Sequence, residues 1–322
     1  MKRIAILVSM LAMAVAGTFA VSIGSSTASA ADDPPAALQT FFDAVNAGDG
    51  DAMAASFTDS GYFEQVDSTT GSFGAFGTAA LQFAFTDIDQ EGIHVTLTSS
   101  SVSGTTVTGV GSLTDNTSRA AGVDRYIQPF VATVDGSKLA SFVVRYDETD
   151  AQTAAYLEYQ AAHDEQGAGD NPADLVELTM SGNQTGVGGA GTVAPGVVLV
   201  FAETTGAPEG VEQPTAIYSG TCDHLGSVVK QLAPALGGSS GNLISMSLDE
   251  LLASPHAITV AAAENSSVIV SCANIVKSAG TTGLPNTGTG GSTGTDLSWL
   301  IAVLALSGIA FAGAGAFAAR RR

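Results

Sequence analysis

Apolar residues near the start of the chain recur at the spacing of an amphipathic helix. Between Asp33 and Gly48 they occupy positions i, i+3, i+4 and i+7, which fall on one helix face. These residues are Leu38, Phe41, Phe42 and Val45. Two prolines after Asp33 suit a helix start, and Gly48 suits an end. The pattern predicts a helix between them, with shorter helices over 51–57 and 76–85.

The apolar period then changes from helical spacing to two. Segment 94–113 alternates around a Ser-Gly turn, and segment 125–146 alternates around the Asp135-Gly136 pair. Each reads as a β-hairpin. A helix is expected over 151–167, because alanine and leucine repeat there at helical spacing. Helices followed by long antiparallel strands predict an α+β cone, with helices packed on a curved antiparallel sheet.

Three stretches in this part resemble the nuclear transport factor 2-like (NTF2-like) superfamily, which includes ketosteroid isomerases and polyketide cyclases. They are LQTFFDAVNAGDGDAMAASFTDSGYF, FGTAALQFAF and VDRYIQPFVATVDGSKLASFVVRYD. The resemblance implies an apolar pocket between helices and sheet, which some members use for catalysis and others only for binding. We take the domain as 31–163.

Polar residues of a ligand pocket can be suggested by type. The candidates for the pocket are Tyr62, His94 and Tyr126, and Asp59, Asp124 and Tyr146 are further candidates for catalysis. None falls on a recognised catalytic position, so we assign no catalytic residue. The alternative is that the tyrosines are core or rim aromatics with satisfied hydroxyls and that the histidine lies at a strand edge.

The second half of the chain predicts a different architecture. Gly, Asn and Pro interrupt the periodicity over 164–174, which predicts a linker. Residues 175–276 contain many short β-like runs separated by turn signals, typical of an all-β sandwich or Greek-key domain. The only two cysteines, Cys222 and Cys272, are expected to form a disulfide if the chain is exported.

Three stretches of this half resemble a bacterial β-domain related to copper/zinc superoxide dismutases and chordin-type repeats. They are PTAIYSGTCDHLGSVVKQL, SLDELLASPHAITV and VIVSCANI. That group usually has a His-x-His motif where Ala216, Ile217 and Tyr218 stand. Only His224 and His256 remain in this half, too few imidazoles for a copper/zinc pair. We therefore expect a scaffold without a metal site and no cofactor.

Both ends of the chain predict targeting segments. Residues 1–30 begin with Lys2 and Arg3, continue with an apolar run and end in Ala-Ser-Ala, as a cleavable signal peptide does. An uncleaved anchor is the alternative. Residues 297–319 carry no charge and are long enough for a transmembrane helix, and the three arginines 320–322 predict a cytoplasmic tail.

A short motif precedes the predicted transmembrane helix. LPNTG, which is Leu284, Pro285, Asn286, Thr287 and Gly288, lies in a Gly/Ser/Thr-rich linker over 277–296. With the apolar span and basic tail it resembles the sorting signal of sortase substrates in Gram-positive-type bacteria. The resemblance implies that sortase cleaves after Thr287 and joins it to peptidoglycan. The alternative is a turn in the linker to a permanent membrane anchor.

Charge narrows the classes of function. The formal net charge is −20, from 31 acidic and 11 basic residues. Such a chain repels phosphate backbones, which argues against nucleic-acid partners. We expect an extracellular, wall-anchored surface protein that binds or presents something without catalysis, a small apolar ligand being one candidate. The membrane is a partner only through the C-terminal helix before sorting. The alternative is an extracellular enzyme acting on a polyketide- or steroid-like molecule.

Overall fold

The computed structural model describes residues 35–67, 71–86, 88–163, 172, 174–263 and 265–276. The predicted signal peptide, the LPNTG motif, the predicted transmembrane helix and the basic tail all lie outside these residues. Within the described ranges no helix is both long and apolar enough to cross a membrane.

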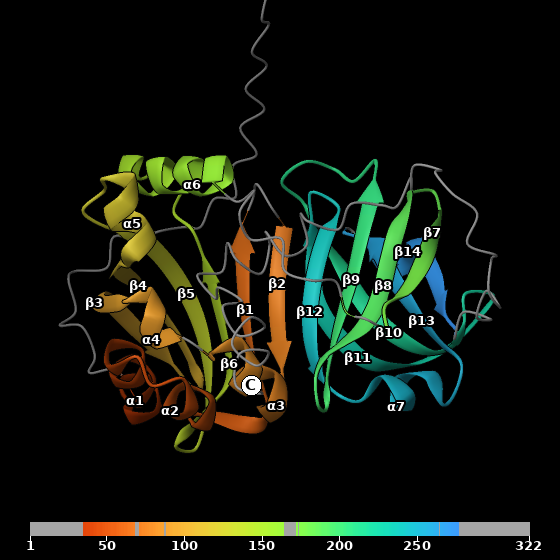
Figure 1. Cartoon of the computed structure of the whole chain (residues 1–322), viewed down its shortest axis with the longest axis horizontal. Helices are drawn as coiled ribbons and strands as arrows, with labels where there is room; N and C mark the ends of the chain where they lie inside the picture. The colour runs from red at the N-terminus through yellow and green to blue at the C-terminus, as the bar shows by residue number, and fades with distance from the viewer. Residues whose placement is uncertain are drawn as a thin grey trace, which may run out of the picture.

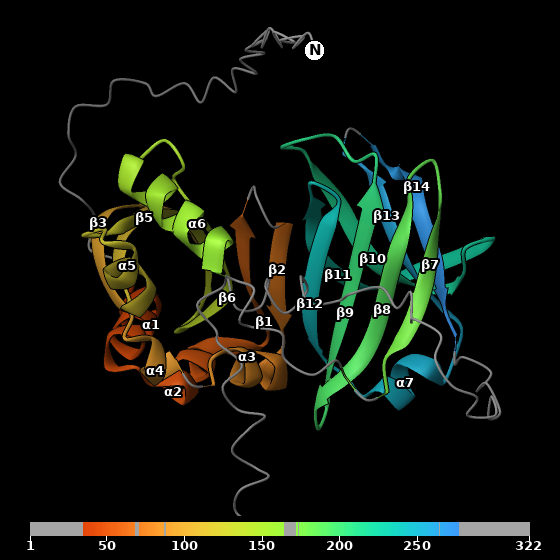
Figure 2. The same cartoon turned by 45° about the horizontal axis from the view of Figure 1, so that its top comes forward.

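The described part of the N-terminal unit, residues 35–163, is a curved six-stranded sheet with helices at both of its ends (Figures 1 and 2). The strands are β1 (Phe57–Asp67), β2 (Gly71–Phe76), β3 (His94–Ser103), β4 (Thr106–Thr114), β5 (Tyr126–Asp135) and β6 (Lys138–Arg145). The helices are α1 (Ala36–Ala47), α2 (Gly50–Ala55), α3 (Thr78–Ala84), α4 (Ile88–Glu91), α5 (Asn116–Ala121) and α6 (Ala151–His163). In the sheet the order is β2-β1-β6-β5-β4-β3, and only the β1–β6 pair among these is parallel.

Helix α1 buries the face that its sequence period predicts. Leu38, Phe41, Phe42 and Val45 are all buried. The helix ends at Gly48, whose left-handed φ of 64° is a conformation that glycine adopts without strain. The phenylalanines of α1 contact those of the sheet, with Phe41 and Phe142 ring centroids 4.8 Å apart. This face therefore closes one end of the curved sheet over an aromatic core.

The C-terminal unit, residues 174–276, is a closed sheet of eight strands. They are β7 (Val176–Gly182), β8 (Thr185–Ala194), β9 (Val197–Thr205), β10 (Glu212–Thr221), β11 (His224–Leu236), β12 (Ser239–Ser245), β13 (His256–Ala262) and β14 (Asn265–Ile275), with the short helix α7 (Leu248–Leu252). The sheet closes because β11 pairs with both β10 and β12. The closed sheet surrounds its own core of valine, isoleucine, leucine and alanine.

The two units share one continuous sheet. Strand β2 pairs in parallel with β12, in a register that runs from Ser72 opposite Ser240 to Phe76 opposite Ile244. The described strands therefore form a single fourteen-stranded sheet. Apolar residues of β9 and β12, among them Phe201 and Leu243, belong to the core of the N-terminal unit. The core thus continues across the boundary.

The predicted fold class, an α+β cone followed by a separate all-β sandwich, is wrong. Strands dominate the described residues, the C-terminal strands close on themselves, and the β2–β12 pair joins both units. Small residues explain how the junction packs: a methyl group at Gly74 would lie 3.2 Å from Ala233 of β11 and closer still to the Phe76 ring. Strand pairing between distant segments depends on such tertiary contacts, which a periodic pattern does not encode.

Candidate functional site

A cavity of about 80 Å³ lies between the helices and the sheet of the N-terminal unit. Its walls are aliphatic and aromatic, apart from three tyrosines and two glutamines. The lining residues are Phe41, Phe42, Val45, Met53, Phe63, Gln65, Phe85, Ile88, Ile93, Val95, Gly111, Leu113, Tyr126, Gln128, Phe130, Phe142, Val144, Tyr146 and Tyr156. Among these described residues there is no carboxylate, imidazole, amine or thiol.

Strand β5 contributes a row of side chains to this cavity. Alternate residues of a strand point to opposite faces, and Tyr126, Gln128 and Phe130 are buried on the inner face. Phe130 meets Phe42 of α1 edge to face, with ring centroids 5.6 Å apart. The strand's period of two therefore places one polar side chain, Gln128, between two aromatic ones.

A buried carboxylate organises the polar end of the cavity. Asp115 is 2% exposed, and its Oδ2 accepts hydrogen bonds from the hydroxyls of Tyr126 at 3.0 Å and Tyr156 at 2.9 Å. Its Oδ1 accepts from the backbone N–H of Ser118 at 2.5 Å, which caps the N-terminus of α5. Both carboxylate oxygens are therefore engaged by protein donors.

Three tyrosines surround this carboxylate. The rings of Tyr126 and Tyr156 stack with centroids 4.2 Å apart, and Tyr146 lies 6.0 Å from each. Burial, above all, raises the pKa of each hydroxyl well above its usual value of 10, and neighbouring acidic groups raise it further. All three remain neutral at physiological pH and so act as hydrogen-bonding hydroxyls.

The two glutamines of the lining differ in their partners. Gln65 Nε2 donates to the Tyr146 hydroxyl at 2.8 Å. Gln128 is only 8% exposed, and its side-chain amide makes no hydrogen bond with any described residue.

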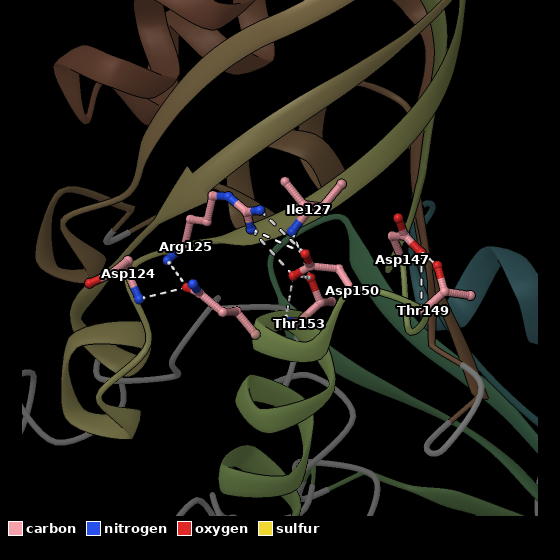
Figure 3. A network of polar contacts seen from close by, with 8 residues as sticks. Asp124, Arg125, Ile127, Asp147, Thr149, Asp150 and Thr153 are labelled. Atoms are coloured by element: carbon pink, nitrogen blue, oxygen red, sulfur yellow. Dashed lines mark hydrogen bonds and ion pairs between the residues drawn. The ribbon is translucent and has the colours of Figure 1, made fainter.

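A network of polar contacts fixes helix α6 against the start of β5 (Figure 3). Arg125 forms an ion pair with Asp150 at 3.3 Å, and Thr153 Oγ1 accepts from the backbone N–H of Ile127 at 2.9 Å. The backbone hydrogen bond from Thr153 holds the pKa of Asp150 below its usual value, and Arg125 adds to the effect. The same helix carries Tyr156, so this network positions a wall of the cavity.

The structure places only some of the sequence candidates at the cavity. Tyr126 and Tyr146 line it. Tyr62 lies outside the lining and stacks on Phe76, with ring centroids 5.3 Å apart. His94 is exposed at the start of β3, and Asp59 and Asp124 are also exposed. Sequence reasoning missed Asp115, Tyr156, Gln65 and Gln128, of which Gln128 was discoverable from its spacing of two from Tyr126.

The predicted disulfide of the C-terminal unit is confirmed. Cys222 and Cys272 are bonded, with an S–S distance of 2.09 Å and Cα atoms 5.9 Å apart. His224 is exposed, while His256 is buried and its Nδ1 lies 2.8 Å from the Leu251 carbonyl oxygen. No group of three or more potential metal ligands exists in the described ranges.

Comparison with known proteins returned similar structures only. No protein-family model and no curated protein matches the chain. One similar structure is an NTF2-like protein of unknown function from Cytophaga hutchinsonii, with 12% identity over 35% of this chain and 88% of that chain, at a TM-score of 0.28. Another, from Catenulispora acidiphila, has a ketosteroid isomerase-like fold, with 14% identity over 35% and 85% of the chains, at a TM-score of 0.29.

A third similar structure is an LEH-like epoxide hydrolase from Mycobacterium tuberculosis. It has 16% identity over 39% of this chain and 90% of that chain, at a TM-score of 0.31. Structural neighbours of this chain thus include NTF2-like and ketosteroid isomerase-like proteins, the superfamily that the sequence resemblance named. Likeness at these TM-scores does not bear on what the cavity holds.

Proposed function

We propose that the chain is an extracellular, cell-wall-anchored surface protein whose N-terminal unit binds a small neutral molecule without transforming it. The observation that carries the proposal is the composition of the cavity lining. It has no group in the described residues that titrates near neutral pH, and its three tyrosines stay protonated. General acid–base catalysis needs a group whose pKa lies near the working pH.

The Asp115 carboxylate supports binding over catalysis. Asp115 does not line the cavity, and both of its oxygens accept hydrogen bonds from the protein. A general base must reach the substrate proton directly or through one water. The alternative, an enzyme acting on a polyketide- or steroid-like molecule, would also need more room, since pockets for such ligands measure roughly 300–1,000 Å³ against about 80 Å³ here.

The proposed location at the cell wall rests on the sequence of the two ends of the chain. A signal peptide over 1–30 would export the chain, and sortase would join Thr287 to peptidoglycan after cleaving the LPNTG motif. The described fold, both of its cores included, would then be displayed outside the cell. Sortase and peptidoglycan are the partners that this proposal implies.

Xenon binding tests the cavity. Xenon enters dry apolar cavities without needing hydrogen bonds. The test uses the chain from Ala31 to Thr287, which contains every described residue, and follows the ¹²⁹Xe NMR shift during titration. We expect saturable binding at one site. If xenon shows only the weak linear shift of non-specific contact, the binding function is wrong.

A further inference from the structure

Helix α6 lies at one end of the curved sheet and buries a face that is mostly polar. Its buried residues are Thr153, Tyr156, Leu157 and Gln160, of which only Leu157 is aliphatic. Helix α1, at the other end of the same sheet (Figure 1), buries two phenylalanines, a leucine, a valine and two alanines. Most of the stability of a helix in a protein comes from the packing of its apolar face, so α6 has less of this stabilisation than α1.

Hydrogen bonds do much of the work of holding α6 in place. The Gln152 carboxamide oxygen accepts from the backbone N–H groups of Asp124 at 2.9 Å and Arg125 at 3.1 Å. Thr153 Oγ1 accepts from the N–H of Ile127, and the tyrosine of the helix donates to the buried carboxylate. The net contribution of each bond is modest, because the same groups bond to water when the helix is detached. Helix α6 can therefore leave the sheet at a lower cost than α1.

The cavity needs a wall that moves if it is to admit a ligand. All of its lining residues except Ile93 are buried, so a molecule in solvent reaches most of the lining only when part of the wall is displaced. Segments with few buried apolar contacts are those that open locally in folded proteins, and the lids of binding sites are drawn from them. Helix α6 has this character and supplies Tyr156 to the wall.

We propose that α6 is the lid of the cavity, and that it separates from the sheet as a unit and admits the ligand past Tyr156. This inference rests on the proposed binding function. Each strand of the sheet is hydrogen-bonded to another strand, so the sheet does not need α6 for its pairing. Opening of the lid thus exposes the cavity while the remaining walls stay in place.

Hydrogen exchange tests whether α6 opens by itself, in the chain from Ala31 to Thr287. Gln152→Ala removes two hydrogen bonds of the lid at a residue outside the cavity lining. Gln39→Ala is the matched control, since Gln39 lies on α1 and donates to Asp43 of the same helix. Relative to the unfolded chain, wild-type α6 amides should exchange about 100-fold faster than α1 amides. Gln152→Ala should raise the α6 rates about tenfold more, and Gln39→Ala should leave them unchanged.

A thiol in the cavity wall tests whether this opening gives access. Val144→Cys places it at a lining residue of β6, and Val107→Cys places it at a buried residue of β4 outside the lining. The two native cysteines are joined in the disulfide, so each variant has one free thiol. Methyl methanethiosulfonate should label Val144→Cys about tenfold faster when Gln152→Ala is also present. Labelling of Val107→Cys should be slow and should not respond to Gln152→Ala.

The outcomes separate the lid from the function on which it rests. Equal protection of α6 and α1, or labelling of Val144→Cys that does not respond to Gln152→Ala, overturns the lid, and xenon binding by the wild type would still support the binding function. Absence of saturable xenon binding overturns the binding function, and the lid with it. Should Val144→Cys fail to fold, the rate at which bound and free xenon exchange decides. Equal rates in the wild type and Gln152→Ala contradict the lid.

Discussion

Tyr126 and Tyr156 donate hydrogen bonds to the same oxygen of Asp115, at 3.0 and 2.9 Å. One tyrosine comes from β5 and the other from α6, so the carboxylate joins a strand and a helix that are far apart in sequence. The Tyr156 hydroxyl also accepts from Gln160 Nε2 at 2.9 Å. The polar end of the cavity is thus held by interactions within the protein and is not itself free to bind a ligand.

Removing one hydroxyl from this cluster should destabilise the protein. Tyr156→Phe leaves the Gln160 amide and Asp115 each without one buried partner, and we expect a loss of about 1–3 kcal/mol. Urea unfolding measures it. Tyr159→Phe, on the more exposed side of the same helix, is the control and should change stability by less than about 0.5 kcal/mol. Equal effects of the two substitutions would contradict the described cluster.

Stability should fall with rising pH because of Glu64. The pKa of this carboxyl is raised from its usual 4.5 to about 7, mainly by burial and then by the nearby Glu212, with Arg145 partly offsetting the rise. Between these two pH values the folded protein keeps a proton that the unfolded chain releases. Stability is therefore lost over that window, by on the order of 3 kcal/mol in total.

Glu64→Gln isolates this effect. The variant should match the wild type most closely at and below about pH 4.5, gain relative stability between about pH 4.5 and about 7, and keep a constant advantage above that. Chemical unfolding at several pH values gives the comparison, with Glu177→Gln at an exposed position as the control. A stability difference between Glu64→Gln and wild type that does not depend on pH would show that Glu64 titrates normally.

Helix α6 should loosen when its first turn loses its cap. Asp150 Oδ1 accepts from the backbone N–H of Thr153 at 3.0 Å and the same carboxylate pairs with Arg125. Asp150→Ala should cost about 1 kcal/mol, as N-cap losses do, and speed amide hydrogen exchange in α6. Arg125→Met removes the ion pair but keeps the cap, so it should have the smaller effect. The reverse ranking would mean that the ion pair, and not the cap, fixes the helix.

Anchoring should depend on one residue of the LPNTG motif. Thr287→Ala should move the protein from the wall fraction to the membrane or the medium, because sortase would lack its expected acyl donor. Wall digestion followed by mass spectrometry locates the protein, and Thr281→Ala outside the motif is the control. Unchanged wall attachment, or an intact C-terminus through Arg322 on wall-associated protein, would contradict sortase anchoring.

The local spacing of apolar residues predicted many of the helices and strands of the N-terminal unit. The i, i+3, i+4, i+7 spacing identified the buried face of α1, and Asp135-Gly136 marked the turn between β5 and β6. The disulfide followed from the cysteine count. These features depend on neighbours in sequence or on simple chemistry, so a single sequence contains the information.

The pairing of strands that are distant in the chain could not be predicted from the sequence in this way. The parallel β2–β12 pair joins segments more than 160 residues apart. Small residues such as Gly74 permit this pairing, but they do not indicate which strand will pair with β2. In the sequence, Asp115 has the pattern of an ordinary helix N-cap. Only the folded structure shows that Tyr126 and Tyr156 lie next to it. Tyr62 and Tyr126 look alike in sequence, yet they lie on opposite sides of the sheet, and only Tyr126 reaches the cavity.

Xenon binding to a cavity-filled variant tests the central claim most directly. Gly111→Val adds three carbon atoms at a residue that lines the cavity, whereas Thr108→Val replaces an exposed side chain of the same strand by one of nearly equal size. We predict one saturable ¹²⁹Xe site in the wild type and in Thr108→Val, and its loss in folded Gly111→Val. Xenon binding that is absent from the wild type, or that survives unchanged in Gly111→Val, would contradict a ligand-binding cavity at this place.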